Sequence, residues 1–261
     1  MYASIGREMK IRVLGAYGAE GLGQRPTSFL VNDRLLIDAG TVGGALTLPE
    51  QMHIEHALIT HSHLDHVAGL AFLTETLAFR ERRAPLTVAS LESVVNALRV
   101  GVFNNVAWPD FAQIPSGAPV MKYRTLVEEA EQRVGDAWVT PVAVNHAVPT
   151  TGFIVHDGGT GFLFSGDTGP TEALWKAARG LRGLRAAFVE CAFPNRMAEL
   201  AAVAGHMTPE LLRREVDKLP AYIPVWIYHV KPQFYDEIAA ELSRVDAARI
   251  TILEQDKTYT L

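Results

Sequence analysis

The amino-acid sequence predicts one α/β domain with two sheets at its centre. Strand-like and helix-like segments alternate along nearly the whole chain, and this alternation favours an α/β architecture. Hairpin signals at Asn32-Asp33 and at Asp157-Gly158-Gly159 add antiparallel strand pairs to it. The sequence contains no linker, no repeat of fixed period and no low-complexity segment, so residues 1–261 are expected to form one domain.

The first half of the chain shows apolar runs with the lengths and boundaries of strands and helices. Strands are expected at residues 10–15, on both sides of Asn32-Asp33, at 56–60 and at 86–90. Apolar positions at helical spacing predict helices at residues 66–80 and 91–100. The segment from Gly101 to Gly117 mixes Asn, Pro and aromatic residues and is expected to be irregular.

The second half of the chain continues the alternation. Strands are expected at residues 120–127, 137–145, 152–155, 161–165, 186–190, 223–228 and 249–253, the last of which closes the chain. Helices are expected at residues 171–179 and 233–243. A further helix begins at Thr208-Pro209-Glu210, where Thr can cap the first turn and Pro fits inside it.

Charge and cysteine content narrow the choice of partners and compartment. The formal net charge is −5 and no run is rich in Lys or Arg, so a long nucleic acid is not expected as a partner. A small anionic substrate held by metal ions stays open, because the metals supply local positive charge. Cys191 is the only cysteine, which excludes an intrachain disulfide and fits a cytoplasmic setting.

Targeting and membrane segments are not expected from the N-terminal sequence or from any other window. No apolar stretch is long enough for a signal sequence or a membrane span, so no membrane partner is predicted. Residues 1–8 precede the first expected strand and are predicted to be a disordered extension. Met9 is therefore an alternative start of translation to Met1.

The strongest chemical signal is the segment THSHLDHVAGL, directly after an expected strand. It places His61, His63, Asp65 and His66 within six residues. Alternation sends His61 and His63 the same way while the chain is extended, and a turn then redirects the other two. Imidazole and carboxylate ligands together suit zinc, with manganese and iron as alternatives. The sequence therefore predicts a site for divalent metal.

Four residues cannot complete two metal sites, so further ligands are expected later in the chain. The candidates end apolar runs or stand beside small residues. His146 ends WVTPVAVNH, Asp167 follows GFLF in FSGDTG, and His229 ends IPVWIYH.

The order HxHxDH, then His, Asp and His, resembles the metallo-β-lactamase superfamily. Asp38 in LLIDAG matches that superfamily's early Asp, which supports the metal-binding loop without itself binding a metal. The resemblance implies a four-layer αββα sandwich with two metal ions at one edge of the sheets. It assigns His61, His63 and His146 to one metal and Asp65, His66 and His229 to the other, with Asp167 as the bridge. An Asp in place of Cys at the bridge suits the phosphodiesterase branch.

Three segments resemble the class II 3′,5′-cyclic nucleotide phosphodiesterases: HSHLDHVAGL, FNNVAWPDF and YHVKP. The chain departs from that pattern after Gly69, where it reads LAFLTET in place of aliphatics followed by Ser. The implied activity is hydrolysis of cyclic AMP, or another small phosphodiester, to a 5′-nucleotide. The implied nucleophile is a hydroxide bridging two divalent ions, zinc being expected.

His206 in GHMTPE and Glu190 in FVECAF resemble a His–acid pair of ribonuclease Z and the cyclic nucleotide enzymes. Such a pair would protonate the departing alkoxide. The resemblance thus gives Asp65, Glu190 and His206 as catalytic residues, Asp65 also being a metal ligand. The alternative for His206 is a helix-flanking residue without a catalytic role.

The aromatic segment around Trp108 is the candidate for binding the nucleotide base. Phe103 and Trp108 would stack on the base, and Asn104 or Asn105 would hydrogen-bond its edge. The alternative is that Phe103, Trp108 and Phe111 are core residues or contacts of a homodimer.

Three other functions remain open on sequence. A ribonuclease Z-like RNA nuclease would share the metals, Glu190 and His206, but would need a basic RNA-binding insertion that the sequence lacks. A hydrolase of another small ester or phosphodiester would use the same ligand set. A metal-stabilised binding protein without activity would not need Glu190 and His206.

Overall fold

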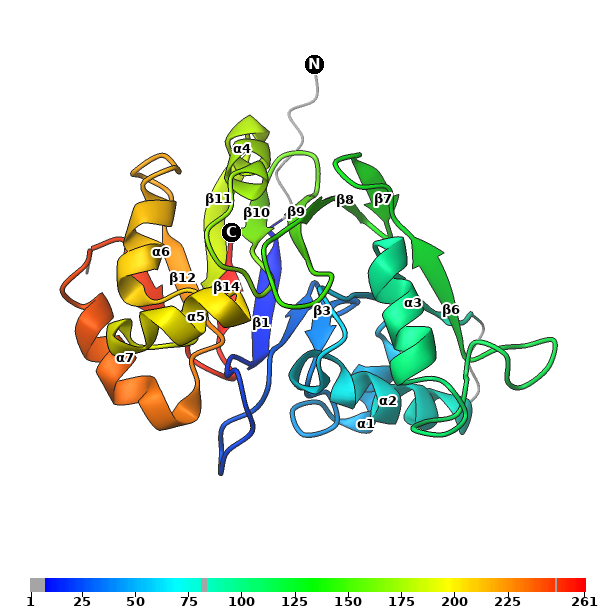
Figure 1. Cartoon of the computed structure of the whole chain (residues 1–261). Coiled ribbons are helices and arrows are strands. Elements are labelled where there is room, and N and C mark those ends of the chain that lie inside the picture. Colours follow the sequence, from blue (N-terminus) through cyan, green and yellow to red (C-terminus); the bar gives the residue numbers. More distant parts are fainter. Residues whose placement is uncertain (1–7, 81–83, 247) are drawn as a thin grey trace, which may run out of the picture.

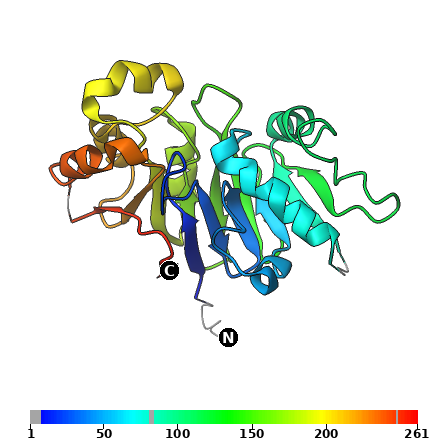
Figure 2. The same cartoon turned by 90° about the horizontal axis from the view of Figure 1, so that it is seen from below.

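The computed structural model of the chain describes residues 8–80, 84–246 and 248–261. The extension predicted for residues 1–8 lies, apart from Glu8, outside the described residues. Two seven-stranded sheets pack face to face, and helices cover the outer face of each (Figures 1 and 2). The αββα sandwich expected from the sequence is therefore confirmed.

The first sheet has the strand order β14-β1-β2-β3-β4-β5-β6. Its strands are β1 (Lys10–Gly15), β2 (Ser28–Val31), β3 (Leu35–Ala39), β4 (His56–Leu58), β5 (Leu86–Ser90), β6 (Met121–Thr125) and β14 (Thr258–Thr260). The pairs from β14 to β3 are antiparallel, and those from β3 to β6 are parallel. The carboxyl ends of β3 and β4 therefore lie at the same edge.

The second sheet has the order β13-β12-β11-β10-β9-β8-β7. Its strands are β7 (Gln132–Val134), β8 (Ala137–Ala143), β9 (Thr151–His156), β10 (Gly161–Phe164), β11 (Leu184–Glu190), β12 (Val225–Tyr228) and β13 (Ile250–Ile252). The strands from β10 to β13 run parallel, and those from β7 to β10 form antiparallel pairs. Each sheet thus combines a hairpin region with a parallel region.

The helices form two groups, one beside each sheet. The first sheet is accompanied by α1 (Leu48–Met52), α2 (Leu64–Ala78) and α3 (Glu92–Gly101). The second is accompanied by α4 (Ala173–Gly180), α5 (Ala198–Ala204), α6 (Pro209–Val216) and α7 (Tyr235–Leu242), with 3₁₀ turns at Asn195–Met197 and Pro232–Phe234. No helix in the described ranges combines the length and the apolarity that crossing a bilayer requires.

Aromatic rings fill the space between the two sheets. Phe29 of the first sheet meets Phe164 and Tyr228 of the second edge-on, with ring centroids 5.1 and 5.4 Å apart. These rings are fully buried. Edge-to-face contacts of this kind add to the free energy gained from burying apolar area, so they fix the spacing between the sheets. Two further apolar layers lie under the helices.

Both predicted hairpins are confirmed. Asn32 and Asp33 have φ angles of 47° and 60°, the left-handed pair that a two-residue turn between twisted strands requires. They join β2 to β3 in an antiparallel pair. β9 and β10 are antiparallel on either side of Asp157-Gly158-Gly159. The other expected strands and helices occur with boundaries shifted by a few residues.

The prediction that the strand at residues 249–253 closes the chain is wrong. β13 is followed by β14, which returns to the first sheet and pairs with β1. Three short elements, α1, α5 and β7, were also not predicted. β7 reads QRV and has a single apolar residue, so it lacks the apolar run that marked the other short strands. The run AELAAVA of α5, by contrast, is rich in Ala, the best helix former.

Candidate metal centre

The carboxyl ends of parallel strands from both sheets meet at one edge of the sandwich. β3 and β4 contribute from the first sheet, and β10, β11 and β12 contribute from the second. Open parallel sheets bind ligands beyond the carboxyl ends of their strands. All residues predicted from the ligand motifs lie on these strands, in the turns that follow them, or just after β8.

The HxHxDH segment spans the junction between β4 and α2. His61 and His63 lie in the extended segment before the helix, and His63 is the residue that caps it, with φ −63° and ψ 146°. Asp65 and His66 lie in the first turn of α2. The redirection expected of a turn is therefore produced by the start of a helix.

The first group of ligand-type atoms belongs to His61, His63 and His146. His61 Nε2 lies 3.0 Å from His63 Nδ1, which in turn lies 3.4 Å from His146 Nε2. One ligand atom of each residue lies within 4.8 Å of the others. His61 is fully buried, and the other two are half-buried, so the group opens toward solvent on one side.

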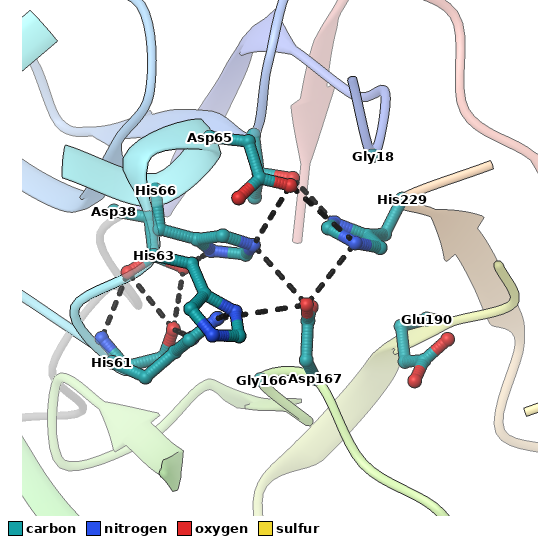
Figure 3. Close-up of polar contacts among 12 residues, drawn as sticks. Gly18, Asp38, His61, His63, Asp65, His66, Gly166, Asp167, Glu190 and His229 are labelled. Atoms are coloured by element: carbon teal, nitrogen blue, oxygen red, sulfur yellow. Dashed lines mark hydrogen bonds and ion pairs between the residues drawn. The ribbon is translucent and has the colours of Figure 1, made fainter. Parts of the chain in front are cut away.

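The second group consists of Asp65, His66 and His229. Asp65 Oδ2 lies 3.9 Å from His66 Nε2 and 3.8 Å from His229 Nε2. Figure 3 shows the two rings and the carboxylate turned toward one point. This group is the more deeply buried of the two, since both of its histidines are inaccessible.

Asp167 stands between the two groups. Its Oδ2 lies 3.7 Å from His61 Nε2 of the first group. It lies 3.3 Å from His66 Nε2 and 3.0 Å from His229 Nε2 of the second (Figure 3). One carboxylate oxygen thus reaches both groups, as a shared ligand must.

In four of the five ligand-type histidines, the ring nitrogen that faces away from the cluster has its own partner. The pairs are His61 Nδ1 with Thr60 Oγ1 at 3.0 Å, His66 Nδ1 with Asp38 Oδ2 at 2.8 Å, His146 Nδ1 with Gly205 O at 3.0 Å and His229 Nδ1 with Thr27 Oγ1 at 3.0 Å. Such bonds fix the tautomer and the orientation of a metal-binding ring. Every Nε2 atom of these four is left facing the cluster.

Two buried residues of the site hold left-handed backbone conformations without being glycine. Asp38 has φ 55° and His229 has φ 63°. This region is costly for most side chains and is least so for Asp and Asn. Gly18 relieves the crowding around His229, because a Cβ there would lie 2.7 Å from its ring and its carbonyl oxygen (Figure 3).

Burial keeps most of these histidines neutral. Burial lowers the pKa of His61 and His229 well below the usual value, and it lowers the pKa of His63 and His146 to a lesser degree. A neutral imidazole offers the lone pair that a metal needs. Burial opposes the charge on Asp167 as well, but the neighbouring His229 and His66 outweigh it and hold the pKa of that carboxyl well below its usual range.

The residues present fit divalent metal ions. Among the described residues, His66 Nε2, which faces Asp167 Oδ2 and Asp65 Oδ2, is buried without a hydrogen-bond partner, and so is Oδ1, the second carboxylate oxygen of Asp167. Unsatisfied buried polar atoms are costly unless something else pairs with them. Ligands about 2.0–2.1 Å from a tetrahedral zinc ion stand about 3.3 Å apart, close to the spacings given above. The nitrogen and carboxylate donors suit zinc, manganese or iron.

Glu190 and His206 form a pair beside the cluster. Glu190 Oε1 accepts a hydrogen bond from His206 Nδ1 at 2.9 Å and from the backbone N–H groups of Thr168 and Met207 at 3.0 and 3.2 Å. The His206 ring stacks on His229 with centroids 5.5 Å apart and meets His146 at 4.9 Å. Burial opposes the charge on His206, but the carboxylate of Glu190 outweighs it and raises the pKa of the imidazole.

The predicted base-binding segment is arranged differently from the expectation. Phe103 is 1% exposed and lies in the core beneath the helices of the first sheet, so its ring is not available to a base. Trp108 is half-buried and meets Phe72 edge-on at 5.4 Å. Asn104 and Asn105 accept hydrogen bonds from backbone N–H groups of their own loop. The core alternative holds for Phe103 and for Phe111, which is also buried.

Sequence reasoning missed Thr27, Thr60 and Gly205, whose oxygens orient ligand-type histidines. Thr60 also donates its backbone N–H and its hydroxyl to Asp38, and so joins that carboxylate to the motif. Its position directly before His61 was an available signal. Thr27 and Gly205 are distant in sequence from the histidines they contact and gave none.

Comparison with known proteins identifies a family match that spans most of the chain. Residues 33–227 match the family described as "Beta-lactamase superfamily domain". A "Probable 3′,5′-cyclic-nucleotide phosphodiesterase" of Yersinia pestis is 28% identical over 207 residues, which are 69% of this chain and 58% of that protein. The chain thus matches a little over half the length of that relative.

Two other similarities bear on the same family. A "Ribonuclease Z" of Halorubrum lacusprofundi is 37% identical over 86 residues, or 31% of this chain and 28% of that protein. The crystal structure of unliganded yeast PDE1 superposes with a TM-score of 0.83 and 20% identity, and covers 97% of this chain and 99% of that one. Since the family match spans three quarters of the chain, the protein belongs to the beta-lactamase superfamily and has its metallo-β-lactamase fold.

Proposed function

We propose that this protein is a binuclear metal-dependent phosphodiesterase that hydrolyses 3′,5′-cyclic nucleotides, cyclic AMP in particular, to 5′-nucleotides. The observation that carries the proposal is the position of Asp167 Oδ2, within 3.7 Å of histidines from both groups. The similarity to the Yersinia pestis protein supports the substrate class. An Asp rather than a Cys at the position shared by the two ligand groups is also consistent with a phosphodiester substrate.

The ligands divide between two divalent ions, for which zinc is the first choice and manganese or iron the alternatives. His61, His63 and His146 would hold one ion, Asp65, His66 and His229 the other, and Asp167 both. When bound, a pair of such ions supplies a hydroxide nucleophile near neutral pH and offsets charge on the phosphoryl oxygens. Thr60, Asp38 and Thr27 hold the rings in place from behind.

His206 is the proton donor for the leaving group. Cleavage breaks the bond between phosphorus and the 3′ oxygen, and the alkoxide formed there must take up a proton. Because Glu190 holds His206 Nδ1, the ring presents Nε2 to the leaving oxygen and returns to the neutral form after donation. The carboxylate of Glu190 favours the charged imidazole before that step.

A second candidate is a nuclease of the ribonuclease Z kind. The 37% identity to the Halorubrum lacusprofundi protein favours it, although this match covers 31% of the chain. The net charge of −5 favours the small substrate, because RNA-binding proteins depend on cationic contacts to phosphates.

The test is hydrolysis of 3′,5′-cyclic AMP by zinc- or manganese-loaded protein, with a chelator-treated sample as control. Release of 5′-AMP that chelation abolishes is the expected result. Cleavage of a nitrophenyl phosphodiester without cleavage of cyclic AMP would exclude the cyclic nucleotide and keep the metal-dependent phosphodiesterase. Cleavage of precursor transfer RNA with a steep salt dependence of binding would favour the nuclease.

A further inference from the structure

One cation at the rim of the metal centre has no role in the scheme above. Lys231 follows His229 by two residues and is half-buried. Its Nζ donates a hydrogen bond to the carbonyl oxygen of Gly18 at 3.0 Å. Gly18 belongs to the loop between β1 and β2 that packs directly on the ring of His229. The hydrogen bond to Gly18 therefore holds the ammonium group near a ligand-type histidine.

The ammonium group also faces the proton-donor side of the site. It lies 5.5 Å from the centre of the Phe193 ring, and that ring meets the His206 ring edge-on at 5.5 Å. Lys231, Phe193 and His206 thus form one continuous wall.

The ammonium group has unused hydrogen-bonding capacity. It carries three N–H donors. In the described part of the chain, the Gly18 carbonyl is its one hydrogen-bond acceptor, and no carboxylate lies within 4.0 Å of Nζ. The other lysines near acids behave differently: Lys218 contacts Glu215 and Glu172, and Lys257 contacts Glu254. The donors that the Gly18 carbonyl leaves free can therefore bind an anionic group of a ligand.

We propose that Lys231 binds an anionic oxygen of the substrate phosphoryl group and so makes the site selective for phosphodiester anions over neutral esters. This inference rests on the proposed function for the substrate class. The wall from Lys231 to His206 places the cation and the proton donor on the same side. Lys231 is accordingly a substrate-binding residue, whereas Glu190 positions His206.

The test compares three variants of the zinc-loaded protein after removal of excess metal. Lys231→Gln removes the charge, Lys231→Arg keeps it, and Lys257→Gln is the matched control, because Lys257 also lies 5.5 Å from an aromatic ring but pairs with Glu254. Binding of inorganic phosphate is measured by calorimetry, metal content by elemental analysis, and KM and kcat with bis(p-nitrophenyl) phosphate.

Lys231→Gln is expected to weaken phosphate binding and raise KM roughly tenfold, as expected for the loss of one charge-assisted hydrogen bond at a partly exposed site. The metal content stays at the wild-type level, and Lys231→Arg and Lys257→Gln stay close to the wild type. Unchanged phosphate affinity in Lys231→Gln overturns the proposal. Loss of metal in that variant also overturns it, because the residue would then act by holding the Gly18 loop. A protein that binds phosphate through Lys231 but cleaves no phosphodiester would refute the proposed function alone.

Discussion

The carboxylate of Asp38 accepts a hydrogen bond from His66 Nδ1 at 2.8 Å, and both residues are completely buried. Burial opposes the charge on His66, but the carboxylates of Asp167 and Asp38 outweigh it and raise the pKa of the ring well above its usual value. The charged ring carries a proton on Nε2 as well as on Nδ1. A metal bound at His66 Nε2 would replace that Nε2 proton. Asp38 would then bear on metal affinity although it binds no metal itself.

Replacing Asp38 by Asn tests this relationship. Asn tolerates the left-handed backbone at φ 55°, so the fold is expected to persist. The loss of negative charge should weaken binding of one metal by about 10–100-fold. Competition with a chromophoric chelator measures the affinity. The control is Asp33→Asn, which lies at φ 60° on the exposed hairpin and should bind metal as the wild type does. Equal metal affinities in the two variants would contradict the role of Asp38.

Replacing Asp167 by Ala removes the oxygen that reaches both ligand groups. We expect fewer than two metal ions per chain and a loss of hydrolysis, because each group keeps three ligands but no shared one. Elemental analysis of the purified variant measures the stoichiometry. Two tightly held ions per chain in Asp167→Ala would show that this carboxylate is not a bridge.

Glu190→Gln should move the pH profile of hydrolysis. Burial opposes the charge on His206, and the carboxylate of Glu190 raises the pKa of that imidazole above its usual value. A general acid must be charged to donate, so activity is lost as the pH rises through this raised pKa. Without the carboxylate the alkaline limb shifts to lower pH. An unshifted limb in a variant that retains both metals would remove Glu190 from this role.

His206→Ala tests the proton donor itself. It should slow poor leaving groups such as the ribose 3′ oxygen far more than nitrophenolate, which departs without protonation. A loss on the order of 10²–10⁴-fold in kcat is typical of a removed general acid. Rates with cyclic AMP and with a nitrophenyl phosphodiester give the comparison. Equal slowing of the two substrates would argue against proton donation.

Trp108→Ala separates the two interpretations of the aromatic segment. The ring packs against Phe72 and the core next to it, so the free energy of unfolding should fall by about 1–3 kcal/mol. KM for cyclic AMP should not change. Denaturant unfolding and steady-state kinetics measure the two quantities. A selective rise in KM with unchanged stability would restore the base-binding role predicted from the sequence.

The sequence predicted which ligand-type residues lie together in the structure, because they are close in sequence or directly follow an apolar strand. His61, His63, Asp65 and His66 come from one junction, and only the start of α2 at Leu64 was needed to orient them. The supporting contacts were largely invisible. Thr27 reaches His229 across 202 residues, and no periodicity in the sequence reports such a pairing.

For the aromatic segment, the sequence suggested a role in base binding that the structure does not support for Phe103. Phe103, Trp108 and Phe111 stood out because they lie among Asn and Pro, but composition does not say which side of a loop faces the core. The structure buries Phe103 and uses the amides of Asn104 and Asn105 to shape the loop. Tertiary packing therefore decided a question that local sequence left open.

The pairing of β14 with β1 has a consequence for the order in which the molecule is made. Lys10 lies opposite Thr260, so one edge of the first sheet stays open until nearly the whole described chain has left the ribosome. All seven ligand-type residues are translated before that strand, and the centre can assemble while the β1 edge still exposes unpaired backbone groups. Unpaired edges invite association with other nascent chains. Until β14 docks, the β1 edge is therefore open to pairing with an edge strand of another chain.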